Sequence, residues 1–216
     1  TENDSSKVQD IIDAGELKNI DLIIGPVYTK NLTKVTKLYG KNQEKTIVSP
    51  LSRNSNVLKH GANIYQIVPP FKLQIDKISD YISKKYKKEK ILILARPEEE
   101  KYANQYKSIF RKVKRKTKLC LFDNLNTITR DTICKFLTNH KYIVLIPSAD
   151  RSFVTKTLTA MGTIDTNMTV FGLHNWKSFE NLDIETLMKL SVHFPDPYYF
   201  DYELLANKRF ITLFKN

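Results

Sequence analysis

The chain is poor in glycine and cysteine and has no long apolar run. Six glycines occur in 216 residues, and none belongs to the Gly-rich loops that bind phosphates or dinucleotides. Two cysteines, Cys120 and Cys134, are too few for a zinc site or a disulfide framework, although one bridge stays open in an oxidising compartment. The longest apolar runs, such as residues 91–95, are far below the roughly 20 residues that span a bilayer. No membrane-spanning segment is expected.

Catalytic signatures are also missing. The sequence holds no Gly-x-Ser-x-Gly, no His-Glu-x-x-His and no Cys-x-x-Cys, which are the arrangements that place nucleophiles, zinc or redox thiols. Cys120 lies in an apolar segment and Cys134 in a predicted helix, where a cysteine acts as a small buried hydrophobe. We therefore predict no enzyme, no cofactor and no metal site.

Positive charge is in excess. Lys and Arg number 35 against 23 Asp and Glu, a net charge of +12, which permits attraction to nucleic acid, anionic lipid or an acidic polymer. Because 28 of the cations are Lys and 7 are Arg, base-edge recognition is disfavoured and no nucleic-acid partner is expected. Two basic runs, residues 84–90 and 111–118, close predicted helices and complement the helix dipole there. We interpret the charge as mainly solubilising.

Apolar periodicity alternates between strand and helix along the whole chain. Strands are predicted at 20–24, 46–48, 64–68, 90–95, 118–122, 142–146, 168–171 and 189–194. Helices are predicted at 29–39, 75–86, 98–114, 128–139, 151–161 and 202–214, with a short turn near Trp176. Alternation with continuously apolar strands favours an α/β fold of open, doubly wound parallel sheets.

Three strand ends carry a resemblance to a known family. Ile24-Gly25-Pro26, Val48-Ser49-Pro50 and Val68-Pro69-Pro70 close the first three strands. In this order the segments resemble type I periplasmic binding proteins, above all the leucine/isoleucine/valine-binding receptors, and the likeness continues through residues 91–106 and 191–195. A cell-wall-associated branch, including activators of peptidoglycan synthases, is also similar. The resemblance implies two doubly wound α/β lobes.

The resemblance covers nearly the whole chain but not a whole family domain. It implies a partial first lobe over 1–69 that lacks its first strand, a second lobe over 70–195, and a crossover with a helix returning toward the first lobe over 196–216. Because residue 1 is Thr and no signal sequence is present, we expect a chain truncated at both ends.

Ligand-contacting positions follow from the same resemblance. In the first lobe they are Thr29, Leu51 and Arg53, with Ser52 in the same loop. Arg53 has the fork geometry that holds a carboxylate through two hydrogen bonds. The alternative is that Thr29 caps its helix and Arg53 faces solvent.

The second lobe contributes Tyr102, which the family closes over its ligand, and the loop residues Ser148, Asp150 and His174. Tyr102 could equally pack on its own helix. The family places an acidic residue near His174 to hold an amino group. Its absence here counts against an α-amino-acid ligand.

Two functions remain open at this point. The first is a non-catalytic, periplasmic or otherwise extracytoplasmic receptor that binds a small polar ligand between its lobes. The ligand would be an amino acid, a peptide or a cell-wall fragment, delivered to an ABC-type membrane permease or another envelope protein. The second is an envelope scaffold associated with peptidoglycan synthesis that no longer binds a small ligand.

Overall fold

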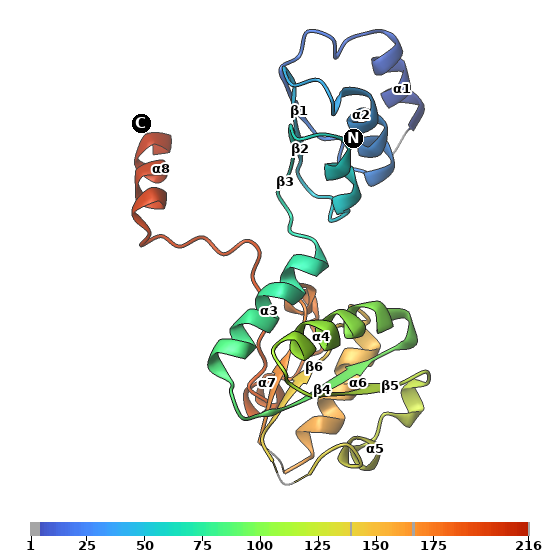
Figure 1. Ribbon diagram of the computed structural model, residues 1–216, viewed down its shortest axis with the longest axis vertical. Helices are drawn as coiled ribbons and strands as arrows, with labels where there is room; N and C mark the ends of the chain where they lie inside the picture. The colour runs from blue at the N-terminus through green and yellow to red at the C-terminus, as the bar shows by residue number, and fades with distance from the viewer. Residues whose placement is uncertain (1–4, 139, 166, 216) are drawn as a thin grey trace. The chain divides into compact units, whose positions relative to one another are not determined.

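A computed structural model describes residues 5–138, 140–165 and 167–215 of the chain (Figure 1). The chain forms two compact units, residues 1–74 and residues 75–216. Each unit is built around its own parallel sheet.

The first unit holds a three-stranded sheet in the order β1-β2-β3, with neighbouring strands parallel. Its strands are β1 (Leu22–Ile24), β2 (Thr46–Ser49) and β3 (Ile64–Gln66). Its helices are α1 (Ser5–Asp13), α2 (Thr29–Tyr39) and the 3-10 helix η1 (Ser55–His60). In Figure 1, α1 and α2 lie on one side of this sheet.

The two faces of the first sheet differ. Ile23, Ile47 and Ile64 form one core cluster with helix residues such as Leu32 and Val35. The alternate residues point the other way, since side chains alternate along a strand: Leu22, Ile24 and Tyr65 are exposed, Ile24 by 69%. This sheet is therefore covered on one face within the described residues.

The second unit holds a four-stranded parallel sheet in the order β5-β4-β6-β7. Its strands are β4 (Lys90–Ala95), β5 (Thr117–Leu121), β6 (Tyr142–Leu145) and β7 (Met168–Phe171). The α-helices are α4 (Glu100–Lys112), α5 (Arg130–Cys134), α6 (Arg151–Gly162), α7 (Ile184–Lys189) and α8 (Leu205–Lys215); α3 (Phe71–Lys85) begins before the boundary between the units. Three 3-10 helices complete it: η2 (Pro97–Glu99), η3 (Leu125–Thr127) and η4 (His174–Ser178).

Helices cover both faces of this second sheet. Ile91 and Ile93 of β4 cluster with Ile82 of α3 and Phe110 of α4. Leu92 and Leu94 alternate with them along β4, so they point to the opposite face, and they are fully buried as well. The predicted α/β fold with doubly wound parallel strands is confirmed. None of the described helices is long and apolar enough to cross a membrane.

Most predicted elements occur where the periodicity placed them, but two predictions were wrong. The strand expected at 189–194 is instead the end of α7 and a turn with Ser191 at φ 44°, and only His193 bridges to Phe171. The Asp183 side chain accepts from the Thr186 N–H and so caps a helix that begins at Ile184.

The helix expected at 128–139 is confined to α5. Phe136 and Leu137 donate their backbone N–H groups to residues three positions earlier, Ile133 and Cys134. This tighter pattern ends the α-helix after about one turn.

A close backbone approach anchors the loops after β6 and β7. A Cβ added to Gly172 would lie 2.4 Å from the ring of Trp176. Trp176 is 1% exposed, and its Nε1 donates to the Ser148 carbonyl at 2.8 Å. Glycine at 172 lets the ring lie flat against the backbone and tie the two loops together.

We predict that Gly172→Ala lowers the free energy of unfolding by about 1–3 kcal/mol, because the added methyl displaces a packed ring. Trp176 is the single tryptophan, so its fluorescence reports the denaturant midpoint of the second unit. Gly162→Ala is the control, since its Cβ would meet the movable Thr186 side chain at 3.1 Å. Equal midpoints for wild type and Gly172→Ala would contradict the packing described here.

Candidate functional site

Each unit gathers polar side chains where its parallel strands end. Because all strands of a parallel sheet point the same way, their carboxyl ends share one edge, and the loops there are the usual ligand site of open α/β sheets. The expected site residues follow β1 and β2 in the first unit and β6 and β7 in the second. Tyr102 lies on α4, which follows β4.

In the first unit, Thr29 and Ser52 meet. Their hydroxyl oxygens are 3.0 Å apart, which joins the first residue of α2 to the loop after β2. The buried Ser52 Oγ also accepts from the Asn54 N–H at 3.2 Å. Thr29 does not cap α2: the cap position is Tyr28, without a side-chain hydrogen bond. Two loops from neighbouring strands thus converge on one hydroxyl pair.

Gln66, at the end of β3, completes this edge. Its Nε2 donates to the Ser52 carbonyl at 2.5 Å. Its Oε1 and the Ser49 Oγ are buried without a hydrogen-bond partner among the described residues. Such atoms ordinarily have a protein, water or ligand partner, since an unpaired buried polar group costs about 1–3 kcal/mol.

Arg53 and Leu51 flank Ser52. The Arg53 guanidinium carbon lies 5.4 Å from the centre of the Phe71 ring, a stacked cation–π arrangement. No ion pair found in residues 5–138, 140–165 and 167–215 involves Arg53. Leu51 is 60% exposed. The carboxyl edge of the first sheet therefore presents a cation without an ion-pair partner among the described residues, beside hydroxyl and amide groups.

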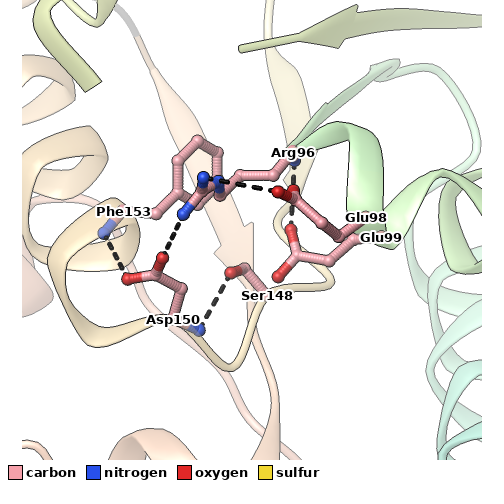
Figure 2. A network of polar contacts seen from close by, with 6 residues as sticks. All are labelled: Arg96, Glu98, Glu99, Ser148, Asp150 and Phe153. Atoms are coloured by element: carbon pink, nitrogen blue, oxygen red, sulfur yellow. Dashed lines mark hydrogen bonds and ion pairs between the residues drawn. The ribbon is translucent and has the colours of Figure 1, made fainter. Parts of the chain in front are cut away.

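In the second unit, Arg96 is the centre of a polar network (Figure 2). It follows β4 directly, and its Nη1 donates to Asp150 Oδ2 at 2.5 Å across the edge of the sheet. Asp150 Oδ1 accepts from the Phe153 N–H at 3.1 Å and so caps α6. Ser148 Oγ accepts from the Asp150 N–H at 3.1 Å. The loops after β4 and β6 are thereby locked together.

The acidic groups of this network differ in their pKa values. Burial raises the pKa of Asp150, but the hydrogen bonds from the Phe153 N–H and the Arg96 guanidinium outweigh it, and the net pKa is lowered. Glu99 Oε2 accepts from the Arg96 N–H at 3.0 Å. Burial raises the pKa of Glu99, and a hydrogen bond with Ser148 offsets it only in part. Asp150 is thus held ionised, whereas Glu99 is more readily protonated.

His174 and Asn175 begin η4, beyond β7. The His174 ring makes an edge contact with Tyr198 at 5.2 Å between centroids. His174 Nδ1, Asn175 Oδ1 and Arg96 Nε are buried without a hydrogen-bond partner in the described part of the chain. They add three unmet polar atoms to the carboxyl edge of the second sheet.

Tyr102 is half-buried on α4 and packs against the core cluster under that helix. Lys101 Nζ lies 4.8 Å from the centre of its ring. Part of this ring therefore has a structural role.

The first unit brings Thr29 and Ser52 into contact, and the second joins Ser148 to Asp150. Sequence reasoning missed Arg96 and Glu99, which organise the second network. The sequence does carry a signal for these two residues, because the charged segment 96–100 comes directly after an apolar strand. It follows β4 as residues 148–150 follow β6.

The described acidic, histidine and cysteine side chains are spread through the fold. The described residues contain no group of three or more His, Cys, Asp or Glu side chains that could hold a metal ion. Cys120 and Cys134 are both free. Burial raises the pKa of the Cys120 thiol to about 11, which leaves it unreactive at neutral pH.

Comparison with known proteins identifies the fold. No protein-family model matches the chain, and no curated protein matches its sequence significantly. Among solved structures, it is similar to an ABC transporter substrate-binding protein from Desulfitobacterium hafniense, with a TM-score of 0.63 and 14% identity over 99% of this chain and 62% of that one. It is also similar to the leucine-binding protein LivK from Thermotoga maritima, with a TM-score of 0.54 and 11% identity over 99% of this chain and 62% of that one.

The C-domain of LpoA from Haemophilus influenzae, a regulator of PBP1A, is similar with a TM-score of 0.59 and 12% identity over 98% of this chain and 67% of that one. The chain spans 38% of a longer LpoA structure. The structural neighbours are therefore LpoA and type I periplasmic binding proteins, and the chain has their fold. Both branches of the resemblance found in the sequence are confirmed at the level of fold.

We predict that Asp150→Ala lowers the free energy of unfolding at pH 7 by about 1–2 kcal/mol, because it removes a helix cap and a partner of Arg96. The lowered Asp150 pKa stabilises the fold above the unfolded-state pKa of about 3.9, and this contribution is lost as pH falls through the folded-state value. Urea unfolding followed by Trp176 fluorescence at pH 7 and near pH 3 measures it.

Asp150→Asn is the matched control, because Asn caps helices as well as Asp but carries no charge. It should retain most of the cap stability and lose the pH dependence. A destabilisation by Asp150→Ala that is the same at both pH values would contradict a role for the ionised carboxylate.

A second prediction concerns the thiols. At pH 8 about one Cys120 thiol in a thousand is ionised if its pKa is about 11, so iodoacetamide should modify Cys134 at least tenfold faster. Timed mass spectrometry of the folded protein measures both rates, and unfolding in urea should make them similar. Equal rates in the folded state would show that Cys120 is not buried as described.

Proposed function

We propose that the chain is the binding part of a non-catalytic, extracytoplasmic receptor, and that the groups at the carboxyl edges of its sheets bind a small polar ligand. One observation carries this proposal. Five of the nine buried polar side-chain atoms without a partner among the described residues lie at these edges: Ser49 Oγ, Gln66 Oε1, Arg96 Nε, His174 Nδ1 and Asn175 Oδ1. A ligand, with ordered water, would supply the missing hydrogen bonds.

The side chains at these edges favour a ligand that carries a carboxylate. Arg53 supplies a cation with no carboxylate partner among the described ion pairs, beside the Thr29 and Ser52 hydroxyls. Arg can bind a carboxylate through two hydrogen bonds. Tyr102, Ser148, Asp150 and His174 are the proposed contacts from the second unit.

Recognition of a free α-amino group is less well supported. Both oxygens of Asp150 are engaged, one by Arg96 and the other by the Phe153 N–H. A peptide or cell-wall fragment with a blocked amino group fits the site better than a free amino acid. The fold shared with ABC transporter substrate-binding proteins supports delivery of this ligand to a membrane permease.

A second candidate function is an envelope scaffold that contacts proteins of peptidoglycan synthesis without binding a small ligand. The engaged Asp150 supports it, as does the similarity to the C-domain of LpoA. The two candidates differ in one respect, namely whether the carboxyl edges bind a small molecule.

A thermal-shift screen against amino acids, short peptides and muropeptides tests the proposal. A ligand at 100 times its dissociation constant stabilises by about 2.7 kcal/mol, so we expect a clear rise in melting temperature for one carboxylate-bearing class. The double variant Arg53→Ala, Tyr102→Ala should lose that rise. The control Arg130→Ala, Tyr199→Ala removes the same residue types at exposed positions outside the site and should keep it.

A cooperative melt with no shift from any compound would favour the scaffold. A shift that survives the double variant would place the ligand elsewhere on the protein.

A further inference from the structure

The two basic runs of the sequence meet at one end of the second unit. Arg115, from the second run, donates from Nη1 to the Tyr86 carbonyl at 2.8 Å and from Nη2 to the Glu89 carbonyl at 2.6 Å. Burial lowers the pKa of Arg115, and its guanidinium stacks on Phe110 at 5.7 Å. Residues 84–90 and 111–118 therefore form one continuous basic face, although 20 residues separate them in the sequence.

This basic face lies at the amino edge of the second sheet. Lys90 is the first residue of β4 and Thr117 the first of β5, while α4 ends at Lys112, just before β5 begins. The polar network of Arg96 and Asp150 follows the opposite, carboxyl ends of the strands. The basic face is thus separate from the proposed ligand site.

A surface hollow opens in the basic face. It has a volume of about 560 Å³, and five of its lining residues are cations: Lys107, Arg111, Lys114, Arg115 and Lys116. The other three are small polar residues, and no lining residue carries a carboxylate. No ion pair found in the described residues involves these five cations.

Lys114 has φ 57° and turns the chain between α4 and β5. This turn keeps the cations on either side of it along the same hollow. Positive charge is therefore concentrated at the hollow, whose five cations make no ion pair among the described residues, whereas Lys84, elsewhere on the face, pairs with Asp80.

We propose that this basic face binds anionic phospholipid headgroups at a membrane surface. Clusters of four to eight Lys and Arg are typical of such binding, with about 1 kcal/mol per basic residue near the bilayer. Val113, 50% exposed between Lys112 and Lys114, offers an apolar contact for the headgroup region. None of the residues that line the hollow is aromatic, so it lacks a surface on which nucleic-acid bases stack.

Binding in this way would leave the carboxyl edge of the second unit facing away from the bilayer and open to ligand. The inference does not depend on the proposed receptor function, because the two sites lie at opposite edges of the sheet. Binding to the bilayer requires only the charge and geometry of the amino edge.

Vesicle co-sedimentation of the full chain tests the inference. We expect binding to vesicles of equal parts phosphatidylcholine and phosphatidylglycerol, little binding to pure phosphatidylcholine, and loss of binding as salt rises from about 0.05 to 0.5 M. The triple variant Arg111→Gln, Lys114→Gln, Lys116→Gln should weaken the partition about a hundredfold.

The matched control is Lys37→Gln, Lys41→Gln, Lys59→Gln, which removes the same charge from exposed positions in the first unit and should bind as the wild type does. Equal loss in both triple variants would overturn the proposal, because net charge alone would then explain binding. So would an absence of vesicle binding, or tighter binding to single-stranded DNA than to the anionic vesicles in a parallel titration.

Discussion

The parallel direction of the strands is the constraint from which the arrangement of this protein follows. In both units, successive strands of a sheet are joined by a loop at its carboxyl edge, a helical segment and a loop at its amino edge. This topology gives each sheet two chemically distinct edges. Hydroxyl, amide and charge-paired groups collect at the carboxyl edges. In the second unit lysines and arginines collect at the amino edge, where α3 and α4 end, and those that line the hollow make no ion pair among the described residues.

The sequence was most informative about the strands of the second unit. Residues 90–95 and 168–171 are apolar on both sides because helices cover both faces of the sheet, and their predicted bounds match β4 and β7. Prediction failed at 189–194, because the cap at Asp183 and the turn at Ser191 decide the structure there rather than apolar periodicity. The division into lobes at 1–69 and 70–195, with a crossover at 196–216, stays a prediction. The compact units of the structure divide after residue 74.

The candidate site could be predicted only in part. Loop positions follow from strand ends, which is why Ser52 and Ser148 could be named from the sequence. Partners across a sheet edge cannot be named in this way: the bond from Arg96 to Asp150 joins residues 54 positions apart. The same limit applies to the basic face. Each lysine run has a sufficient local explanation in its helix dipole, and the bonds of Arg115 to Tyr86 and Glu89 appear only in the folded chain.

Amide hydrogen exchange with and without a ligand that raises the melting temperature tests the central claim most directly. If the carboxyl edges hold the ligand, protection should increase in the loops after β1, β2, β4, β6 and β7, which include Thr29, Ser52, Arg96, Ser148 and His174. The amino-edge segments around Lys90 and Lys116 should remain unchanged. Protection confined to the amino edges, with none in these loops, would contradict the account.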